Sequence, residues 1–301
     1  FSGYKFDYII SNPPFGIPWK REEKEVEAEF KKGTAGRFAP GLPAKGDGQL
    51  LFMLNGLAKL KDDGQMAIIQ NGSSLFNGDA GSGPSEIRRY LIENDWLDAI
   101  VQLPNNAFYN TGIATYIWLV MKNKPVTHQG KVQLIDASNC ASSRRKNIGL
   151  KNGDLIVKAY GAYVDETYKG IEENGNAIIV KSKVMDSVDL GYNKIVVETP
   201  QFDENGNVMM KKNKLMVDTS KRDTENVPLA EDIDAYFERE VIPYNPHAWV
   251  DKSKTKVGYE IPFTRTFYEY KKIEPSGVIA ARIEEHEKGL MAKLHELFGG
   301  E

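Results

Sequence analysis

The tetrapeptide Asn12-Pro13-Pro14-Phe15 brings together groups that could bind an amine. The Asn12 side chain carries a carbonyl acceptor on a short arm, and the backbone carbonyl of Pro13 is a second acceptor in a peptide stiffened by proline on both sides. Two fixed acceptors match the two N–H donors of an NH₂ group. Phe15 adds a flat face on which a planar ring can stack. These residues therefore predict a site that holds an exocyclic amine of an aromatic ring.

The residues before the tetrapeptide predict the element that positions it. Phe6 to Ser11 read as a buried β-strand that is apolar on both faces, as strands of parallel sheets are. Two consecutive prolines donate no backbone hydrogen bond and cannot continue a strand, so the strand must end there. Doubly wound sheets bind ligands at the C-terminal ends of their parallel strands. The alternative is that the tetrapeptide only terminates a strand.

Strands and helices alternate through the first 138 residues, which predicts a doubly wound α/β sheet. A connection over residues 16–48 contains six glycines, and a loop of this length is usually a lid or a binding loop, here with room for a short helix. The strands are expected at residues 6–11, 65–69, 96–104, 115–123 and 131–138, and the helices at 49–60, ended by Asp-Asp-Gly, and 81–95.

The alternation weakens after residue 139. Residues 145–175 look helical in part, residues 176–183 and 192–200 look like strands, and Pro243 and Pro246 end a helix within 227–246. Ser276 to Phe298 has apolar residues at helical spacing and predicts an amphipathic helix. We therefore expect three parts, at residues 1–138, 139–275 and 276–301.

Composition excludes several classes of protein. The sequence has 301 residues, 41% of them hydrophobic and 27% charged, which is typical of globular chains. Its longest apolar run, Ile113 to Met121, has nine residues and is too short to cross a bilayer. One cysteine, Cys140, fits a reducing cytoplasm, and four scattered histidines predict no metal site. A net charge of −3 means that any contact with nucleic acid needs a local basic surface.

The segment FDYIISNPPFG resembles motif IV of the amino-methyltransferases, whose [Asn/Asp/Ser]-Pro-Pro-[Tyr/Phe] loop holds the amine being methylated. The rest of the chain resembles the modification (methylase) subunit of type I restriction–modification systems. The segments that carry this resemblance follow in the family's order: GDGQLLFMLNGLAKLKDDGQMAII, IRRYLIENDWLDAIVQLPNNAFYNTGIATYIWLVMKNK, VQLIDAS and VPLAEDIDAYFEREVIPYNPHAWVDKSKTKVGYEIPFTRTFYEY. It covers nearly the whole chain and is weakest over residues 150–215.

The resemblance implies a reaction and roles for its residues. The family transfers a methyl group from S-adenosylmethionine to the 6-amino group of adenine in DNA, and the adenine must first leave the duplex. Asn12, Pro13, Pro14 and Phe15 match the catalytic loop. Phe15 would stack on one face of the base and Phe108 on the other, with Tyr109 as a weaker candidate for the second role. Alternatively, Phe108 is a core aromatic after a buried strand.

One departure from the family concerns the cofactor. Its S-adenosylmethionine loop, a Gly-rich turn after the first strand, lies before motif IV and has no counterpart in these 301 residues. The resemblance thus implies the C-terminal portion of a Rossmann-like methyltransferase sheet, followed by an α+β extension and a C-terminal helix. The glycines at 78–83 do not follow the right strand to replace the loop, which leaves Asn12 as the cofactor-binding candidate. Binding of S-adenosylmethionine is then expected to need the N-terminal half of the family's methyltransferase domain. The strand at Phe6–Ser11 is expected to lie at an edge of the sheet, with one side unpaired.

The resemblance also implies partners. These are DNA, the specificity subunit, a second methylase subunit and the restriction subunit, with no membrane contact. The terminal helix would dock on the specificity subunit. Arg144, Arg145 and Lys146 could reach DNA phosphates, although a solvated loop explains them as well. Asp47 resembles a family position, but it could equally cap the helix that begins near Gln49.

Two other functions stay open at this point. Methyltransferases that act on protein glutamine or on cytosine N4 use a tetrapeptide of the same kind to bind the amine. The segment LPNNAFYNTGI and the type I-like C-terminal region argue against these two functions. The second alternative is not an enzyme: a DNA-binding or assembly fragment without a cofactor site of its own.

Overall fold

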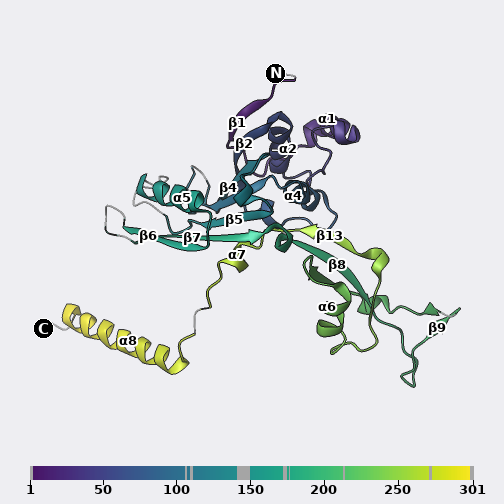
Figure 1. Ribbon diagram of the computed structural model, residues 1–301. Helices are drawn as coiled ribbons and strands as arrows, with labels where there is room; N and C mark the ends of the chain where they lie inside the picture. The colour runs from purple at the N-terminus through teal and green to yellow at the C-terminus, as the bar shows by residue number, and fades with distance from the viewer. Residues whose placement is uncertain are drawn as a thin grey trace. The chain divides into compact units, whose positions relative to one another are not determined.

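A seven-stranded sheet in the order β1-β2-β4-β3-β5-β7-β6 forms the framework of the first 186 residues (Figure 1). The computed structural model describes residues 3–105, 107–108, 111–140, 150–171, 175, 177–212, 214–270 and 273–298. The strands of this sheet are β1 (Phe6–Ser11), β2 (Leu60–Asn71), β3 (Leu97–Gln102), β4 (Thr115–Met121), β5 (Lys131–Asp136), β6 (Glu166–Ile171) and β7 (Ala177–Asp186).

The direction of the strands brings five of their C-terminal ends to one edge. β1 pairs with β2 in parallel and β3 with β5 in parallel, while β4 lies antiparallel between β2 and β3. β7 lies antiparallel to both β5 and β6. β1, β2, β3, β5 and β6 therefore all end at what we call the C-terminal edge. The expected α/β class is confirmed, but the sheet is mixed. β4 follows β3 without an intervening helix among the described residues, and such a connection favours antiparallel pairing.

Five helices accompany this sheet: α1 (Glu23–Lys31), α2 (Gln49–Lys59), α3 (Ser73–Phe76), α4 (Gly83–Glu93) and α5 (Leu150–Ala162). α2 buries the predicted apolar face, including Leu50, Leu54 and Leu57. The expected stop signal at residues 62–64 is wrong: α2 already ends at Lys59, and residues 62–64 belong to β2. The reason is pairing, because β2 starts at Leu60 opposite Phe6 of β1 and absorbs the extra residues in an irregularity of the register.

β1 is an edge strand, and the prediction that it is buried on both faces is wrong. Tyr8 is 73% exposed and Ile10 is 91% exposed. In the part of the chain that the structure describes, β1 pairs only with β2, and nothing covers the face that carries these two side chains. Apolar residues on both faces predict burial only where both faces have neighbours. The expected edge position is confirmed.

A second sheet combines β8 (Gly191–Glu198), β11 (Asp223–Pro228), β12 (Trp249–Val250) and β13 (Lys256–Tyr259). Helix α6 (Ile233–Glu240) packs on it through Phe237, beside the buried Val197 and Val227. The Glu198 side chain, 2% exposed, forms ion pairs with Arg222 Nη2 at 2.8 Å and Lys254 Nζ at 2.7 Å.

One buried side chain joins helices α3 and α4 to the second sheet. Arg88 of α4 is fully buried and donates from Nε to the Tyr259 carbonyl at 2.6 Å and from Nη1 to the Ser74 carbonyl at 3.1 Å. Burial lowers the pKa of Arg88 to about 10. The remaining short elements are β9 (Met210–Lys211), β10 (Lys214–Leu215), α7 (Phe263–Thr266) and the 3-10 turns Lys20–Glu22, Gly33–Ala35, Val126–His128, Ser187–Leu190, Thr219–Lys221 and Lys252–Lys254.

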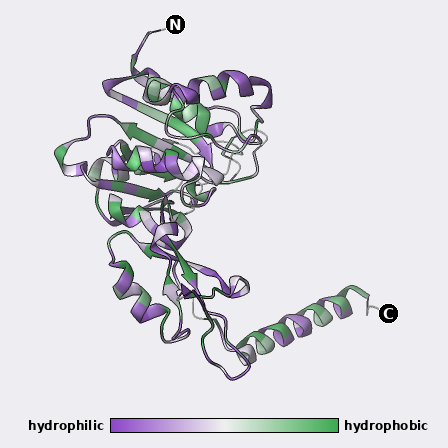
Figure 2. Ribbon diagram, turned by 90° about the vertical axis from the view of Figure 1, so that its right-hand side faces the viewer, coloured by the Kyte–Doolittle hydropathy of each residue, from purple (hydrophilic) through white to green (hydrophobic). Residues whose placement is uncertain are grey.

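Residues 1–266 form one compact unit, and residues 267–301 form another. The second unit contains α8 (Ser276–Phe298), whose bounds match the predicted helix. None of its described residues is buried. Figure 2 shows apolar and polar residues alternating along α8, as expected for an amphipathic helix. Among the described residues, no helix combines the length and apolarity needed to span a membrane.

Candidate active site

A cavity of about 710 Å³ opens at the C-terminal edge of the sheet. It lies between the loop that follows β1 and the loop that joins β3 to β4, which meet because β1 and β3 end at the same edge. The cavity therefore brings Phe15 and Phe108, distant in sequence, to the walls of one space. Its lining comprises Asn12, Pro13, Pro14, Phe15, Phe108, Thr111, Gly112 and Ile113.

The two acceptors of the tetrapeptide are not used by the fold. Asn12 is exposed, and its side chain makes no hydrogen bond with any described residue. The Pro13 carbonyl likewise accepts no hydrogen bond from a described residue. Both oxygens thus remain available to N–H donors of a ligand in the cavity.

Phe108 serves the cavity and the core together. Its ring lines the cavity and also packs against a buried cluster that includes Val101 and Leu103 of the β3 region. The loop that carries it is held at its base by a hydrogen bond from Leu103 N to Thr115 O at 2.8 Å. A backbone bond from Thr111 N to the Phe108 carbonyl, at 3.4 Å, turns the chain beside the ring. Both sequence-based interpretations of Phe108 are thus compatible with its position.

Three lining residues were missed by the sequence analysis. Thr111, Gly112 and Ile113 follow Phe108 and form part of the cavity wall. Their signal was their place in the segment LPNNAFYNTGI, which was singled out for its aromatic residue alone. Tyr109 and the basic residues Arg144, Arg145 and Lys146 lie outside the described residues.

The chain immediately after Phe15 is anchored by its own later segment. Trp19 is 6% exposed and donates from Nε1 to the Ala44 carbonyl at 3.0 Å and from its backbone N to the Lys45 carbonyl at 3.1 Å. Gly48 N donates to the Ile17 carbonyl at 3.0 Å. These bonds clamp residues 17–19 to residues 44–48, directly before α2, and so fix one end of the tetrapeptide loop.

A polar cluster ties that clamp to the end of β2. Gln49, 2% exposed, donates from Nε2 to Asp47 Oδ2 and to Asn71 Oδ1, both at 2.8 Å. Asn71 N donates back to Gln49 Oε1 at 3.0 Å, and Ser73 Oγ lies 2.6 Å from Gln49 Nε2. Asp47 Oδ1 also accepts from Gln49 N at 3.2 Å. The prediction that Asp47 is the N-cap of α2 is wrong, because the helix begins one residue later than such a cap requires. The cap residue itself is Gly48.

The glycine segment at residues 78–83 is packed against the chain itself. A Cβ placed on Gly83 would lie 1.8 Å from the Leu42 carbonyl oxygen, so this backbone approaches residues 41–42 too closely for any side chain. The neighbouring cavity, about 360 Å³, is lined by Gly78 and Gly83 together with polar residues such as Asp47 and apolar residues such as Leu50.

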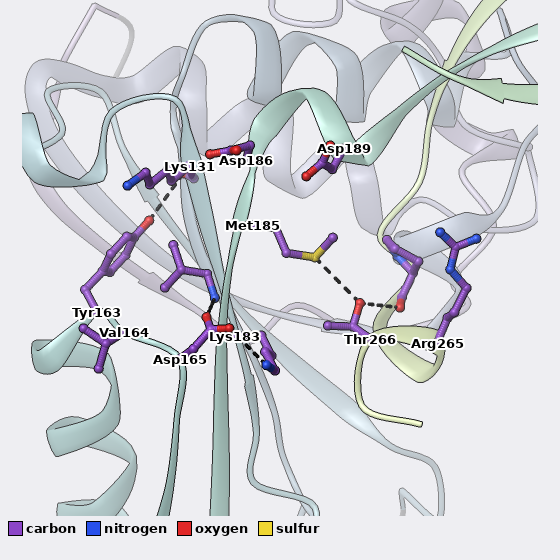
Figure 3. Close-up of a pocket in the computed structure, with 12 residues that line it drawn as sticks. Lys131, Tyr163, Val164, Asp165, Lys183, Met185, Asp186, Asp189, Arg265 and Thr266 are labelled. Carbon is purple, nitrogen blue, oxygen red and sulfur yellow. Dashed lines mark hydrogen bonds and ion pairs between the residues drawn. The ribbon is translucent and has the colours of Figure 1, made fainter. Parts of the chain in front are cut away.

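A further cavity of about 630 Å³ lies at the opposite edge of the sheet, beside the start of β5 and the end of β7 (Figure 3). Lys183 pairs there with Asp165 at 3.0 Å, and Val184 N donates to the same carboxylate at 2.7 Å. Both carboxylates and cations line its wall, among them Asp186 and Arg265. The cavity therefore has no uniform charge and is not part of the site around Asn12.

Comparisons with known proteins agree on one family. Residues 2–199 match the family model described as N-6 DNA Methylase. The methylase subunit of the type I restriction enzyme MpnII from Mycoplasma pneumoniae is 32% identical over 165 residues, which cover 54% of this chain and 28% of that protein. The HindI methylase subunit from Haemophilus influenzae is 26% identical over 228 residues, 75% of this chain and 45% of that protein.

A solved structure shows the same similarity. The methyltransferase subunit of a type I restriction-modification system from Streptococcus thermophilus is 25% identical and superposes with a TM-score of 0.51, over 63% of this chain and 36% of that one. The 301-residue chain thus spans less than half the length of each of these three proteins.

Proposed function

Because this chain belongs to the N-6 DNA methylase family, we propose that it supplies the amine-binding part of the active site in an adenine N6-methyltransferase subunit of a type I restriction–modification system. One observation carries the proposal: two uncommitted acceptors, Asn12 Oδ1 and the Pro13 carbonyl, share a cavity with the rings of Phe15 and Phe108. Relatives that are type I methylase subunits support the choice of system.

The acceptors would act on the nucleophile. The lone pair of an adenine amine is delocalised into the ring, which makes the nitrogen a poor nucleophile. When Asn12 Oδ1 and the Pro13 carbonyl each accept one N–H bond, the nitrogen moves towards tetrahedral geometry and its lone pair is freed. Positive charge develops on this nitrogen during methyl transfer, so both hydrogen bonds strengthen in the transition state. No side chain has to remove a proton first.

The aromatic walls would hold the base. Adenine must rotate out of the duplex to present its amine, and the enzyme then reads it in a pocket. We propose that Phe15 stacks on one face of the base and Phe108 on the other. Pro13 and Pro14 would stiffen the backbone and so fix the positions of the two acceptor oxygens. A cavity of about 710 Å³ is within the usual range for a bound small molecule. Thr111 and Ile113 would border the edge of the base.

In this reaction S-adenosylmethionine supplies the methyl group. Gly83 approaches the Leu42 backbone too closely for any side chain, and the cavity beside the glycine segment at 78–83 is a different one from the cavity that Asn12 lines. We therefore assign to this chain the roles at the acceptor amine, with Asn12 as the residue nearest to the transferred methyl.

Helix α8 would join the subunit to its partner. Its apolar side chains are exposed, among them Ile283 at 55%, Leu290 at 61% and Leu297 at 75%. An isolated helix is only marginally stable in water, so a partner surface is expected to cover this face. Family resemblance favours the specificity subunit as that partner. DNA, a second methylase subunit and the restriction subunit would complete the assembly.

The test is identification of the methylated product. The complex that contains this chain is incubated with labelled S-adenosylmethionine and unmodified genomic DNA, and the DNA is digested to nucleosides. N6-methyladenine should carry the label. Label in N4-methylcytosine, or in protein glutamine when a protein extract replaces DNA, would contradict the proposal. Absence of any product from a complex that binds DNA would favour the non-catalytic alternative.

A further inference from the structure

A two-stranded ribbon, β9 and β10, carries three lysines among six residues. Lys211, Lys212 and Lys214 are all exposed. None of them makes an ion pair with a described residue. The ribbon is rooted by backbone bonds from Gln201 N to Met216 O at 2.7 Å and from Met209 N to Gln201 O at 2.8 Å. Its strands therefore project from a fixed base.

The lysines are arranged unfavourably for the ribbon alone. Lys214 is the direct cross-strand partner of Lys211, and like charges placed directly opposite each other destabilise a pair of strands. Lys212 has a φ of +50°, a conformation that residues other than glycine rarely adopt. Residues that destabilise their own secondary-structure element are typical of functional sites, where a bound ligand compensates for the cost. A polyanion would neutralise all three charges at once.

The other face of the ribbon is apolar. Met210 and Leu215 form the second cross-strand pair and are 58% and 42% exposed. A two-stranded ribbon with one cationic and one apolar face has the dimensions to enter a DNA groove, with its cations near phosphates and its apolar side chains near sugars or base edges.

We propose that the β9–β10 ribbon binds the phosphate backbone of duplex DNA through Lys211, Lys212 and Lys214. The inference rests on the proposed function, which makes DNA the substrate. Charge supports it as well: the chain has a net charge of −3, so attraction to DNA has to come from local cationic surfaces such as this one. The ribbon comes from residues 210–215, outside the segment 2–199 that matches the family model.

The salt dependence of DNA binding tests the inference. Anisotropy of a fluorescein-labelled duplex is titrated with the complete complex between about 50 and 200 mM salt, where each phosphate contact adds about 0.9 to the slope of log K against log salt. Lys211→Gln, Lys212→Gln and Lys214→Gln together should reduce the slope by about 2.7. The same three positions changed to Arg keep the charge and should retain the wild-type slope.

A second control separates position from net charge. Lys151, Lys158 and Lys169 are exposed on α5 and β6, and their replacement by Gln removes the same charge elsewhere. An equal loss of slope in both triple variants, or an unchanged slope in the ribbon variant, would overturn the inference. Asn12→Ala, measured in parallel, should lose methyl transfer while keeping its slope. If the wild-type complex transfers no methyl group, yet only the ribbon variant reduces the salt dependence of DNA binding, the proposed function is refuted and the inference about the ribbon is retained.

Discussion

Replacement of Asn12 by Ala should separate catalysis from folding and from DNA binding. The Asn12 side chain is exposed and has no partner among the described residues, so its removal should change the free energy of unfolding by less than about 0.5 kcal/mol. Its loss removes one of two acceptors that strengthen as charge develops on the amine. Loss of one such group typically costs about 10²–10³ in rate, or about 2.7–4 kcal/mol of transition-state stabilisation.

Single-turnover methyl transfer is the appropriate assay. Labelled S-adenosylmethionine and DNA are mixed with excess complex, so that product release does not limit the observed rate. Affinity for DNA, measured by anisotropy, and the melting temperature should match those of the wild type. Asn12→Asp, which keeps an acceptor oxygen in place, should retain more activity than Asn12→Ala. Asn105→Ala is a matched control, because Asn105 is exposed after β3 but does not line the cavity.

Two results would refute this reasoning. A single-turnover rate for Asn12→Ala within a few-fold of the wild type would show that the acceptor pair does not assist the reaction. An equal loss of activity in Asn105→Ala and Asn12→Ala would show that the loops at this edge matter for another reason, such as DNA docking.

Three further predictions concern the aromatic walls, a buried ion pair and the sheet edge. Phe15→Ala should weaken retention of a flipped base by about 1–3 kcal/mol, measured by 2-aminopurine fluorescence, with little change in the stability of the protein. Phe108→Ala should weaken retention of the base and also lower the melting temperature, because Phe108 packs on the core. Glu198→Gln should destabilise the protein by about 1–3 kcal/mol at neutral pH, measured by urea unfolding. A hydrogen bond from Arg222 holds the pKa of Glu198 below its ordinary value of 4.5, so this difference should shrink as the pH falls below 4.5 and Glu198 becomes protonated in the folded state; a constant difference would contradict it. Ile10→Lys should reduce self-association of the purified chain in light scattering, since Ile10 is 91% exposed on an edge strand, and unchanged scattering would contradict it.

Local patterns were sufficient for several features. The double proline ends β1 at Ser11 because it removes two backbone donors, and the spacing of apolar residues placed α8 at Ser276–Phe298. Chemistry alone also identified Asn12 and Pro13 as an acceptor pair, since that inference depends only on side-chain type and peptide stiffness. These features were predictable because they depend on neighbours close in sequence.

Features that depend on distant pairing were not predictable in the same way. β11, β12 and β13 are short or polar strands, and their pairing with β8 comes from tertiary contacts rather than from alternation of apolar residues. The start of β2 at Leu60 is likewise set by its partner β1. Gln49 reads as an ordinary helix residue, yet it is buried and hydrogen-bonded to Asn71 because the end of β2 reaches it.

The residues of the candidate site were recognisable from sequence, whereas the site itself was decided by topology. Asn12 and Phe15 end one strand, and Phe108 follows another, so nothing local relates them. They share one cavity because β4 lies antiparallel between β2 and β3, which leaves β1 and β3 parallel and directs both loops to the same edge. The exposure of β1 has a similar origin, because burial depends on whether another element covers a face and not on how apolar that face is.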